Sequence, residues 1–213
     1  MKNNSTVFRL VLTAFFLAIL LLFAFVPFLG FIPLGPINAT TMHIPVIIAS
    51  IILGPKIGGF LGGCFGLISM IRATIIVTPM SFAFSPFIAP IGAEHGSLAA
   101  VFIAIVPRIL IGIVPYFVFR GLTTLLKGNY QPFSLFLAGV AGGLTNTFLV
   151  MYAIYFFFQK EYASLIGKAG NAVYLAINSV ILTQGIPEAI VAGIATATVA
   201  SVLMKLTKRT TLN

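Results

Sequence analysis

The strongest constraint on this chain is a series of long apolar stretches that contain almost no charge. The first stretch, Val7–Val26, has Arg9 as its only charged residue. A helix needs roughly 20 apolar residues to cross the hydrocarbon core of a bilayer. Lipid cannot satisfy backbone N–H and C=O groups, so each stretch must be helical. Since 60% of the residues are hydrophobic and 7% are charged, the sequence predicts an all-α membrane protein.

We expect one integral-membrane domain, 1–213, because no part of the chain has the composition of a soluble domain. Its spans are predicted at about 7–26, 40–54, 57–72, 97–120, 132–158 and 176–206. The first is too long for a signal-peptide core, and no small-x-small cleavage site follows it. The second is short for a full crossing, so we expect it to begin earlier or to be tilted.

Two connections in this plan are apolar and rich in proline, unlike solvated linkers. The connection after span one carries Pro27, Gly30, Pro33, Gly35 and Pro36, and the connection after span three carries Pro79, Pro86 and Pro90. We expect both connections to act as lids over an outward-facing cavity, because lids exclude water from a bound ligand.

The basic residues predict the orientation of the bundle, since cytoplasmic loops carry an excess of Lys and Arg. With both termini inside, the cytoplasmic face holds Lys2, Arg9, Lys56, Arg120, Lys127, Lys205, Lys208 and Arg209. The outer face holds Arg72, Lys160 and Lys168, with the acids Glu94 and Glu161. Both termini are therefore predicted to be cytoplasmic.

Small residues recur four apart on several predicted helices, a spacing that lets helix backbones approach closely. We expect the stripes on spans three, five and six to pack within the bundle; they are Gly58, Gly62 and Gly66, with Gly59 and Gly63 beside them, then Gly139 and Gly143, then Ala189, Gly193, Ala197 and Ser201. The pair Ala14 and Ala18 differs, because it lies among Phe, Leu and Ile. This pair is consistent with two interpretations: a docking stripe for another membrane subunit, or packing within the bundle.

Three polar residues fall at comparable depth inside apolar spans: Arg108, Asn146 and Glu188. A charge at the centre of a bilayer costs roughly 2.5–3.5 kcal/mol, so it must face a partner or a polar cavity. One interpretation is a ligand pocket lined by these side chains. The alternative is an ion pair between Arg108 and Glu188 that only holds two helices together.

Four further residues are weaker candidates for the same pocket. Arg72 ends span three, where it can also snorkel to the interface. His43 and Thr41 begin span two, where a histidine is often a local hydrogen-bonding residue and a threonine often caps the helix. Gln184 lies in span six, close to Glu188.

Several kinds of catalytic site are missing from the sequence. It contains no Asp, no P-loop motif and no H-E-x-x-H motif. The two histidines, His43 and His95, are not at metal-ligand spacing, and Cys64 is the only cysteine. We therefore expect no enzyme activity, no cofactor, no metal site and no nucleic-acid partner.

The stretch 25–66 reads FVPFLGFIPLGPINATTMHIPVIIASIILGPKIGGFLGGCFG. Together with Ser85-Pro86, Pro107-Arg108, the run GGLTN at 142–146 and Gly185-Ile-Pro-Glu188, it resembles the substrate-binding S components of energy-coupling factor (ECF) vitamin transporters, closest to the pantothenate type. The resemblance covers nearly the whole chain. It implies six membrane helices with cytoplasmic termini in a cell-membrane protein, and a vitamin bound near the outer face beneath the first connection.

The same resemblance implies a transmembrane coupling (T) subunit and two ATP-binding subunits as partners. The coupling subunit would dock on an Ala-x-x-x-Ala pattern, which Ala14 and Ala18 match. Pantothenate would place its carboxylate on Arg108 or Arg72, its amide on Asn146 and its hydroxyls on Glu188. The alternatives are an S component for riboflavin, pyridoxine or hydroxymethylpyrimidine, a non-transporting membrane scaffold subunit, and a secondary transporter or channel that works without an ATPase.

Overall fold

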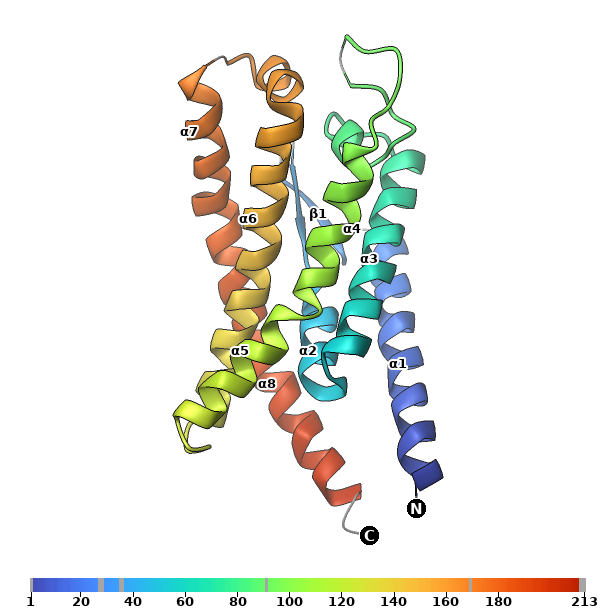
Figure 1. Ribbon diagram of the computed structural model, residues 1–213, viewed down its shortest axis with the longest axis vertical. Coiled ribbons are helices and arrows are strands. Elements are labelled where there is room, and N and C mark those ends of the chain that lie inside the picture. The colour runs from blue at the N-terminus through green and yellow to red at the C-terminus, as the bar shows by residue number, and fades with distance from the viewer. Residues whose placement is uncertain (1, 27–28, 35–36, 91, 169, 211–213) are drawn as a thin grey trace.

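The computed structural model describes residues 2–26, 29–34, 37–90, 92–168 and 170–210. Pro27, Gly35 and Pro36 of the first connection lie outside the described residues, as do the side chains of Lys2, Lys208 and Arg209. The structure is a bundle of long helices, and the two ends of the chain lie at the same end of that bundle (Figure 1).

The elements follow one another in an order close to the predicted one. They are α1 (Lys2–Phe25), β1 (Phe31–Leu34), β2 (Ile37–Thr40), α2 (His43–Leu53), α3 (Pro55–Ile75), a 3-10 turn (Ser81–Ala83), α4 (Ala99–Ile111), α5 (Val114–Leu125), α6 (Gln131–Ile166), α7 (Asn171–Val180), a π-helical turn (Ile181–Gly185) and α8 (Ile186–Thr210).

Helix length and hydropathy confirm the all-α membrane fold. Within the described residues, five helical segments are long and apolar enough to cross a bilayer: Thr6–Phe25, Pro55–Ile75, Ala99–Leu125, Gln131–Ile166 and Asn171–Leu206. The third combines α4 with α5, and the fifth combines α7, the π-helical turn and α8. The predicted end of span five at Phe158 coincides with a kink, where φ is −133° and ψ is 33°, and α6 continues beyond it to Ile166.

Span two differs from its prediction. Helix α2 does not begin earlier than His43, and its 11 residues extend only about 16 Å at 1.5 Å per residue. An antiparallel hairpin precedes it, with Phe31 opposite Thr40 and Leu34 opposite Ile37. The backbone N–H of Thr41 donates to the Gly30 carbonyl and closes the base of this hairpin. Hydropathy alone does not reveal the hairpin, because β1 is apolar throughout whereas β2 includes Asn38 and Thr40.

The glycine stripe of α3 packs inside the bundle, as predicted. A methyl group added at Gly58, Gly62 or Gly66 would overlap the backbone carbonyl of a residue on or just after α4: Gly112, Arg108 and Ala104, respectively. Gly139 and Gly143 of α6 meet the backbone of α8 at Ala192 and Ala189. These close approaches fix the height of α3 relative to α4 and of α6 relative to α8.

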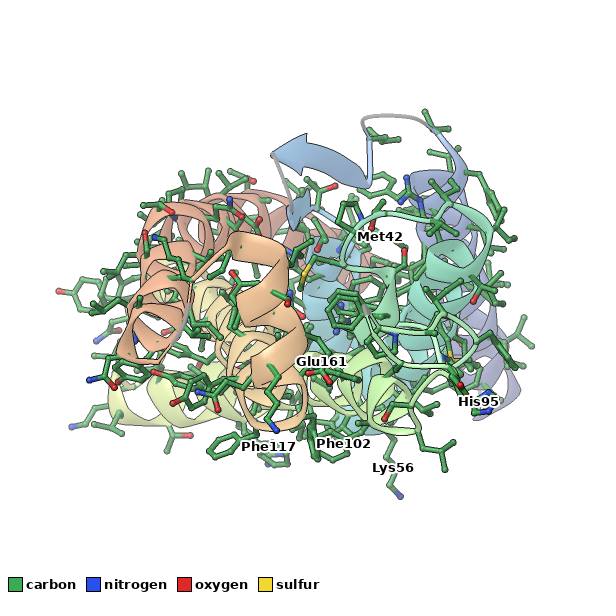
Figure 2. The ribbon with its side chains drawn as sticks, turned by 90° about the horizontal axis from the view of Figure 1, so that it is seen from above. Met42, Lys56, His95, Phe102, Phe117 and Glu161 are labelled. Carbon is green, nitrogen blue, oxygen red and sulfur yellow. The ribbon has the colours of Figure 1, made fainter. Side chains whose placement is uncertain are left out.

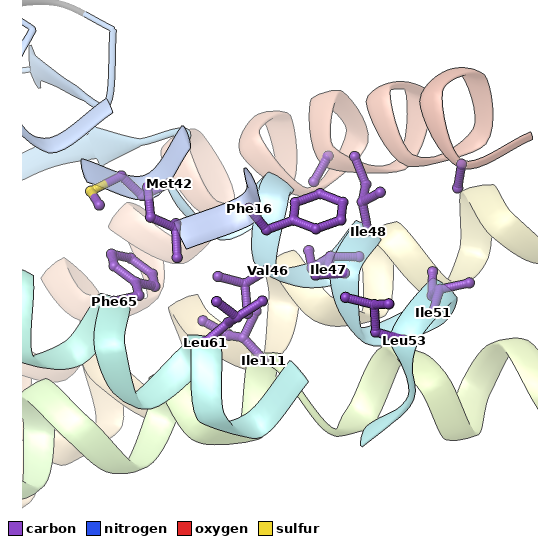
Figure 3. Close-up of a cluster of buried hydrophobic side chains, with 14 of the residues drawn as sticks. Phe16, Met42, Val46, Ile47, Ile48, Ile51, Leu53, Leu61, Phe65 and Ile111 are labelled. Atoms are coloured by element: carbon purple, nitrogen blue, oxygen red, sulfur yellow. The ribbon is translucent and has the colours of Figure 1, made fainter. Parts of the chain in front are cut away.

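Two clusters of buried apolar side chains form the core. The first joins α1, α2 and α3, where Phe16, Val46 and Leu61 pack together (Figure 3). The second joins the 3-10 turn to α4, α6 and α7 through Phe82, Ile103 and Phe158. The ring centroids of Phe82 and Phe158 lie 5.4 Å apart in an edge-to-face contact, which fixes the connection between α3 and α4 against the kink of α6.

The α2–α3 and α5–α6 connections lie at the end of the bundle that holds the termini, and the α6–α7 connection lies at the opposite end (Figure 1). This distribution fits the sorting of basic residues made from the sequence. The cytoplasmic location of the termini stays a prediction. Seen from above, the side chain of Lys56 projects outward from the rim of the bundle (Figure 2).

Candidate binding cavity

A cavity lies among the helices, beside the end of α3 that is remote from the termini. Its empty space measures about 940 Å³, a value that includes open solvent at its mouth. Its polar lining comes from β2, α3, the α3–α4 connection, α4, α6, the π-helical turn and α8: Thr40, Ser69, Arg72, Thr78, Ser81, Arg108, Asn146, Thr147, Gln184 and Glu188. Apolar side chains, among them Met80, Phe84, Met151 and Ile154, complete the wall.

Arg108 is the most deeply buried charge in this wall, with 4% of its surface exposed. Its Nη1 donates to the backbone carbonyl of Ile103 at 2.7 Å. Its guanidinium carbon lies 5.5 Å from the ring centroid of Phe65 and 5.2 Å from that of Phe84, so cation–π contacts flank the charge. The buried Nε has no hydrogen-bond partner among the described residues.

The ion pair between Arg108 and Glu188 that the sequence allowed is not formed. No carboxylate in the described part of the chain lies within 4.0 Å of the Arg108 guanidinium. Both side chains instead face the same cavity. The buried charge therefore retains hydrogen-bonding capacity that the protein does not use.

Asn146 faces Arg108 from α6 and is 7% exposed. Its Oδ1 has no hydrogen-bond partner within the described ranges, and the same holds for the buried Oγ of Ser69 on α3. Buried polar atoms in proteins are nearly always hydrogen-bonded. Two such atoms in one cavity, beside the Arg108 Nε, indicate that the cavity is built to bind a polar molecule.

The π-helical turn Ile181–Gly185 brings two further polar residues into the wall. Pro187 has no N–H to continue the helical ladder, and the wider turn precedes it directly. Single π turns of this kind are frequent at functional sites. Gln184 and Glu188 both line the cavity, as does Thr40 of β2. The hairpin and α8 therefore meet at the cavity wall.

The connection between α3 and α4 forms one side of the cavity and is held by a set of hydroxyl groups. Thr74 Oγ1 lies 2.7 Å from Ser85 Oγ, and the backbone N–H of Thr78 donates to Ser81 Oγ at 2.8 Å. Ser81 and Ser85 are buried. These bonds shape an otherwise irregular segment, so Met80 and Phe84 have fixed places in the wall.

Five of the seven residues predicted for the pocket line this cavity: Arg72, Arg108, Asn146, Gln184 and Glu188. The other two do not. The hydroxyl of Thr41 donates to the Leu29 carbonyl, and His43 is 1% exposed with Nδ1 3.5 Å from Thr40 Oγ1. Neither residue caps α2 through its side chain, because the N-cap of this helix is Met42. Thr41 and His43 therefore support the base of the hairpin.

Sequence reasoning missed Ser69, Thr78, Ser81, Phe84 and Thr147 in the lining. Ser69 was within reach, because it precedes Arg72 by three residues and such pairs share a helix face. The residues of the α3–α4 connection gave no periodic signal. The hydroxyl bonds just described and the contact between Phe82 and Phe158 hold this connection in place.

The electrostatics of the cavity favour an anion with hydrogen-bonding groups. Its lining holds two arginines and one glutamate, and a guanidinium binds a carboxylate through two parallel hydrogen bonds. Asn146 and Gln184 can donate and accept at once. The apolar part of the wall suits a ligand with aliphatic groups.

The predicted docking pair lies on a different surface. Ala14 and Ala18 are exposed on α1, as are Val11 and Phe15 beside them, whereas Phe16 and Leu20 point into the core. The pair therefore faces away from the bundle, and no neighbouring helix of the described chain covers it.

The fold and cavity together define a multi-pass membrane protein with a buried small-molecule site. A family model for the substrate-specific component of ECF transporters matches residues 8–200. The pantothenic acid transporter PanT of Lactococcus lactis subsp. cremoris (strain MG1363) is 42% identical over 170 residues, covering 80% of each chain. The pantothenate transporter PanT of Leuconostoc mesenteroides subsp. mesenteroides is 30% identical over 213 residues, covering 98% of each. The chain belongs to the family of ECF transporter substrate-specific components.

Proposed function

We propose that this protein captures pantothenate in the cavity described above and delivers it to an ATP-driven ECF importer in the cell membrane. The observation that carries the proposal is Arg108, a buried arginine on a cavity wall with no carboxylate of the described chain beside it. A ligand carboxylate completes the hydrogen bonding of this guanidinium. Both PanT relatives are transporters of this vitamin by name.

The chemistry of pantothenate matches the distribution of groups around the cavity. The carboxylate is assigned to Arg108, with Arg72 nearer the end of α3. The amide is assigned to Asn146, whose Oδ1 lacks a partner within the described residues. The two hydroxyls are assigned to Glu188 and Gln184, and the geminal methyl groups to the side chains of Met80, Phe84 and Met151.

Other vitamins fit this wall less well. Pyridoxine and hydroxymethylpyrimidine have no carboxylate for Arg108 or Arg72. Riboflavin carries a large planar ring system that needs aromatic surfaces on which to stack, and Phe84 is the one aromatic residue among the described residues that line the cavity. The net positive charge of the lining favours the anion.

We assign ATP hydrolysis to two partner subunits and not to this chain. A transmembrane coupling subunit is expected to dock on the outward face of α1 at Ala14 and Ala18, where small side chains allow close helix contact. The exposure of both alanines supports this assignment. The full importer would then consist of this chain, the coupling subunit and the two ATP-binding subunits.

Isothermal titration of the detergent-purified protein tests the substrate assignment. We expect saturable binding of pantothenate and no competition from riboflavin, pyridoxine or hydroxymethylpyrimidine at equal concentration. Saturable binding of one of these three in place of pantothenate would overturn the assignment. Absence of binding by all four would leave the scaffold interpretation in its place.

A further inference from the structure

We infer that Pro107 is a positioning residue for Arg108: it frees the Ile103 carbonyl to hold the guanidinium in its ligand-binding orientation. This inference rests on the proposed function, because it concerns how the same cavity receives a carboxylate. It assigns a role to a residue that does not itself line the cavity.

The backbone of α4 lacks one of its regular hydrogen-bond donors. In an α-helix each N–H donates to the carbonyl four residues earlier, so the residue at position 107 would donate to Ile103. Proline has no N–H, and Pro107 lies inside the otherwise continuous helix Ala99–Ile111. The Ile103 carbonyl therefore lacks its regular donor at a depth where no water is available to replace it.

The side chain of the next residue supplies the missing donor. Arg108 Nη1 donates to the Ile103 carbonyl at 2.7 Å, a bond that reaches five residues back along the chain. Both residues are buried, with Ile103 at 0% and Arg108 at 4% exposure. Because residue 107 has no N–H, the guanidinium does not share the Ile103 carbonyl with a helical donor.

This bond and two aromatic rings fix the guanidinium on three sides. Phe65 lies 5.5 Å away and Phe84 lies 5.2 Å away, measured from the guanidinium carbon to each ring centroid. The Nε–H has no partner within the described residues. A guanidinium that is already ordered loses less conformational entropy when it binds a carboxylate, so the anchor raises affinity for ligands that carry one.

A purely structural role for Pro107 makes a different prediction. A proline that only shaped α4 would affect every ligand and the stability of the empty protein together. A proline that acts through Arg108 affects the carboxylate alone. Pantothenol, in which a hydroxymethyl group replaces the carboxylate of pantothenate, separates the two cases.

The experiment compares Pro107→Ala, Arg108→Gln, the double variant and the control Pro132→Ala. Pro132 lies exposed in the first turn of α6, where a proline frees no carbonyl. Titration of each purified variant gives the Kd for pantothenate and for pantothenol, and thermal unfolding reports on the empty protein. Pro107→Val carries the same restored N–H with a larger side chain, and it replaces Pro107→Ala if that variant does not fold.

We expect Pro107→Ala to raise the Kd for pantothenate about ten-fold, the effect of losing one hydrogen bond at a charged group. The Kd for pantothenol should change less than about two-fold, as should both values in Pro132→Ala. In the Arg108→Gln background Pro107→Ala should have no further effect, because residues that act as a unit are not additive.

Equal losses for the two ligands would overturn the inference, as would an additive double variant or an unchanged Kd for pantothenate. Failure of the proposed function has another signature, because the unsubstituted protein would then bind no pantothenate. In that case the positioning role of Pro107 would be overturned together with the proposed function.

Discussion

Gly62 of α3 lies against the backbone carbonyl of Arg108 on α4, so close that a single methyl group at position 62 would overlap it. Gly58 and Gly66 make the same kind of contact one turn away on either side. The stripe of small residues therefore sets the height of Arg108 relative to Ser69 and Arg72 on the neighbouring helix. Helix packing and the arrangement of the cavity depend on the same three glycines.

Substitution of Gly62 by alanine should lower both stability and affinity for pantothenate. The added methyl group must push α4 away, at a cost of about 1–3 kcal/mol for overpacking. Gly63 is the matched control, since the nearest atom to a methyl group there is Ile109 Cγ1 at 3.8 Å. Thermal unfolding and titration of both variants check this. Equal damage from Gly63→Ala would show that the contact with the Arg108 carbonyl is not the cause.

The two arginines of the cavity should differ in their effect on binding. We expect Arg108→Ala to weaken pantothenate binding by about 2–5 kcal/mol, or at least thirty-fold in Kd, because truncation removes the buried partner of the ligand carboxylate. Arg72→Ala should cost less, because Arg72 lies at the end of α3 and is only partly buried. Titration calorimetry measures both. A larger loss for Arg72 would move the carboxylate to that end of the cavity, and unchanged binding in Arg108→Ala would remove Arg108 from the site.

Loss of the Glu188 carboxylate should shorten the lifetime of the bound ligand. Glu188 lines the cavity together with Thr40 of the hairpin, and its carboxylate is assigned to the ligand hydroxyls. A hydrogen bond to a charged group contributes about 1.5–3 kcal/mol, so its loss corresponds to roughly a ten-fold or larger increase in dissociation rate. Stopped-flow release of pantothenate from Glu188→Ala measures this rate.

Glu94 provides the control for that experiment, because it is one of the chain's three acidic residues and lies exposed, away from the cavity. Glu94→Ala should release pantothenate at the rate of the unsubstituted protein. If Glu188→Ala also released it at that rate, the Glu188 carboxylate would have no part in retaining the ligand.

The outward face of α1 should matter for transport and not for binding. We expect Ala14→Leu with Ala18→Leu to leave the Kd for pantothenate unchanged, since both side chains point away from the bundle. Uptake into vesicles that contain the complete importer should fall about ten-fold or more, because bulky residues cost about 1–3 kcal/mol at a closely packed contact. Ile194→Trp, at a position 55% exposed on α8, controls for bulk on a lipid-facing surface. Normal uptake by the double leucine variant would place the docking surface elsewhere.

The membrane fold was predictable because hydropathy reports directly on the solvent that surrounds a segment. Helices overlap the predicted spans one, three, five and six, and α6 continues to Ile166 beyond the predicted end of span five. The hairpin before His43 was not predicted, because Phe31–Leu34 and Ile37–Thr40 are each only four residues long and do not share one hydropathy pattern. The π-helical turn at Ile181–Gly185 was also missed. It depends on how Pro187 is accommodated, and hydropathy does not encode that.

For the cavity residues, the sequence predicted only how deep in the membrane they lie. Counting residues along each span placed Arg108, Asn146 and Glu188 at similar heights, and the cost of burying polar groups in lipid implied that they face inward. Whether Arg108 and Glu188 pair or line a space depends on helix rotation and on the glycine contacts of α3, which a single sequence does not specify. Phe84 and Ser81 belong to a segment with no periodicity, and their places depend on the Thr74–Ser85 and Thr78–Ser81 hydroxyl pairs.

Native mass spectrometry of the full-length protein, purified from cells fed isotopically labelled pantothenate, tests the substrate assignment most directly. The account predicts one small molecule bound per protein chain, with a mass that increases by the mass of the label, and loss of that species in Arg108→Ala. A bound molecule whose mass does not change with the label, or no bound molecule under these conditions, would contradict it.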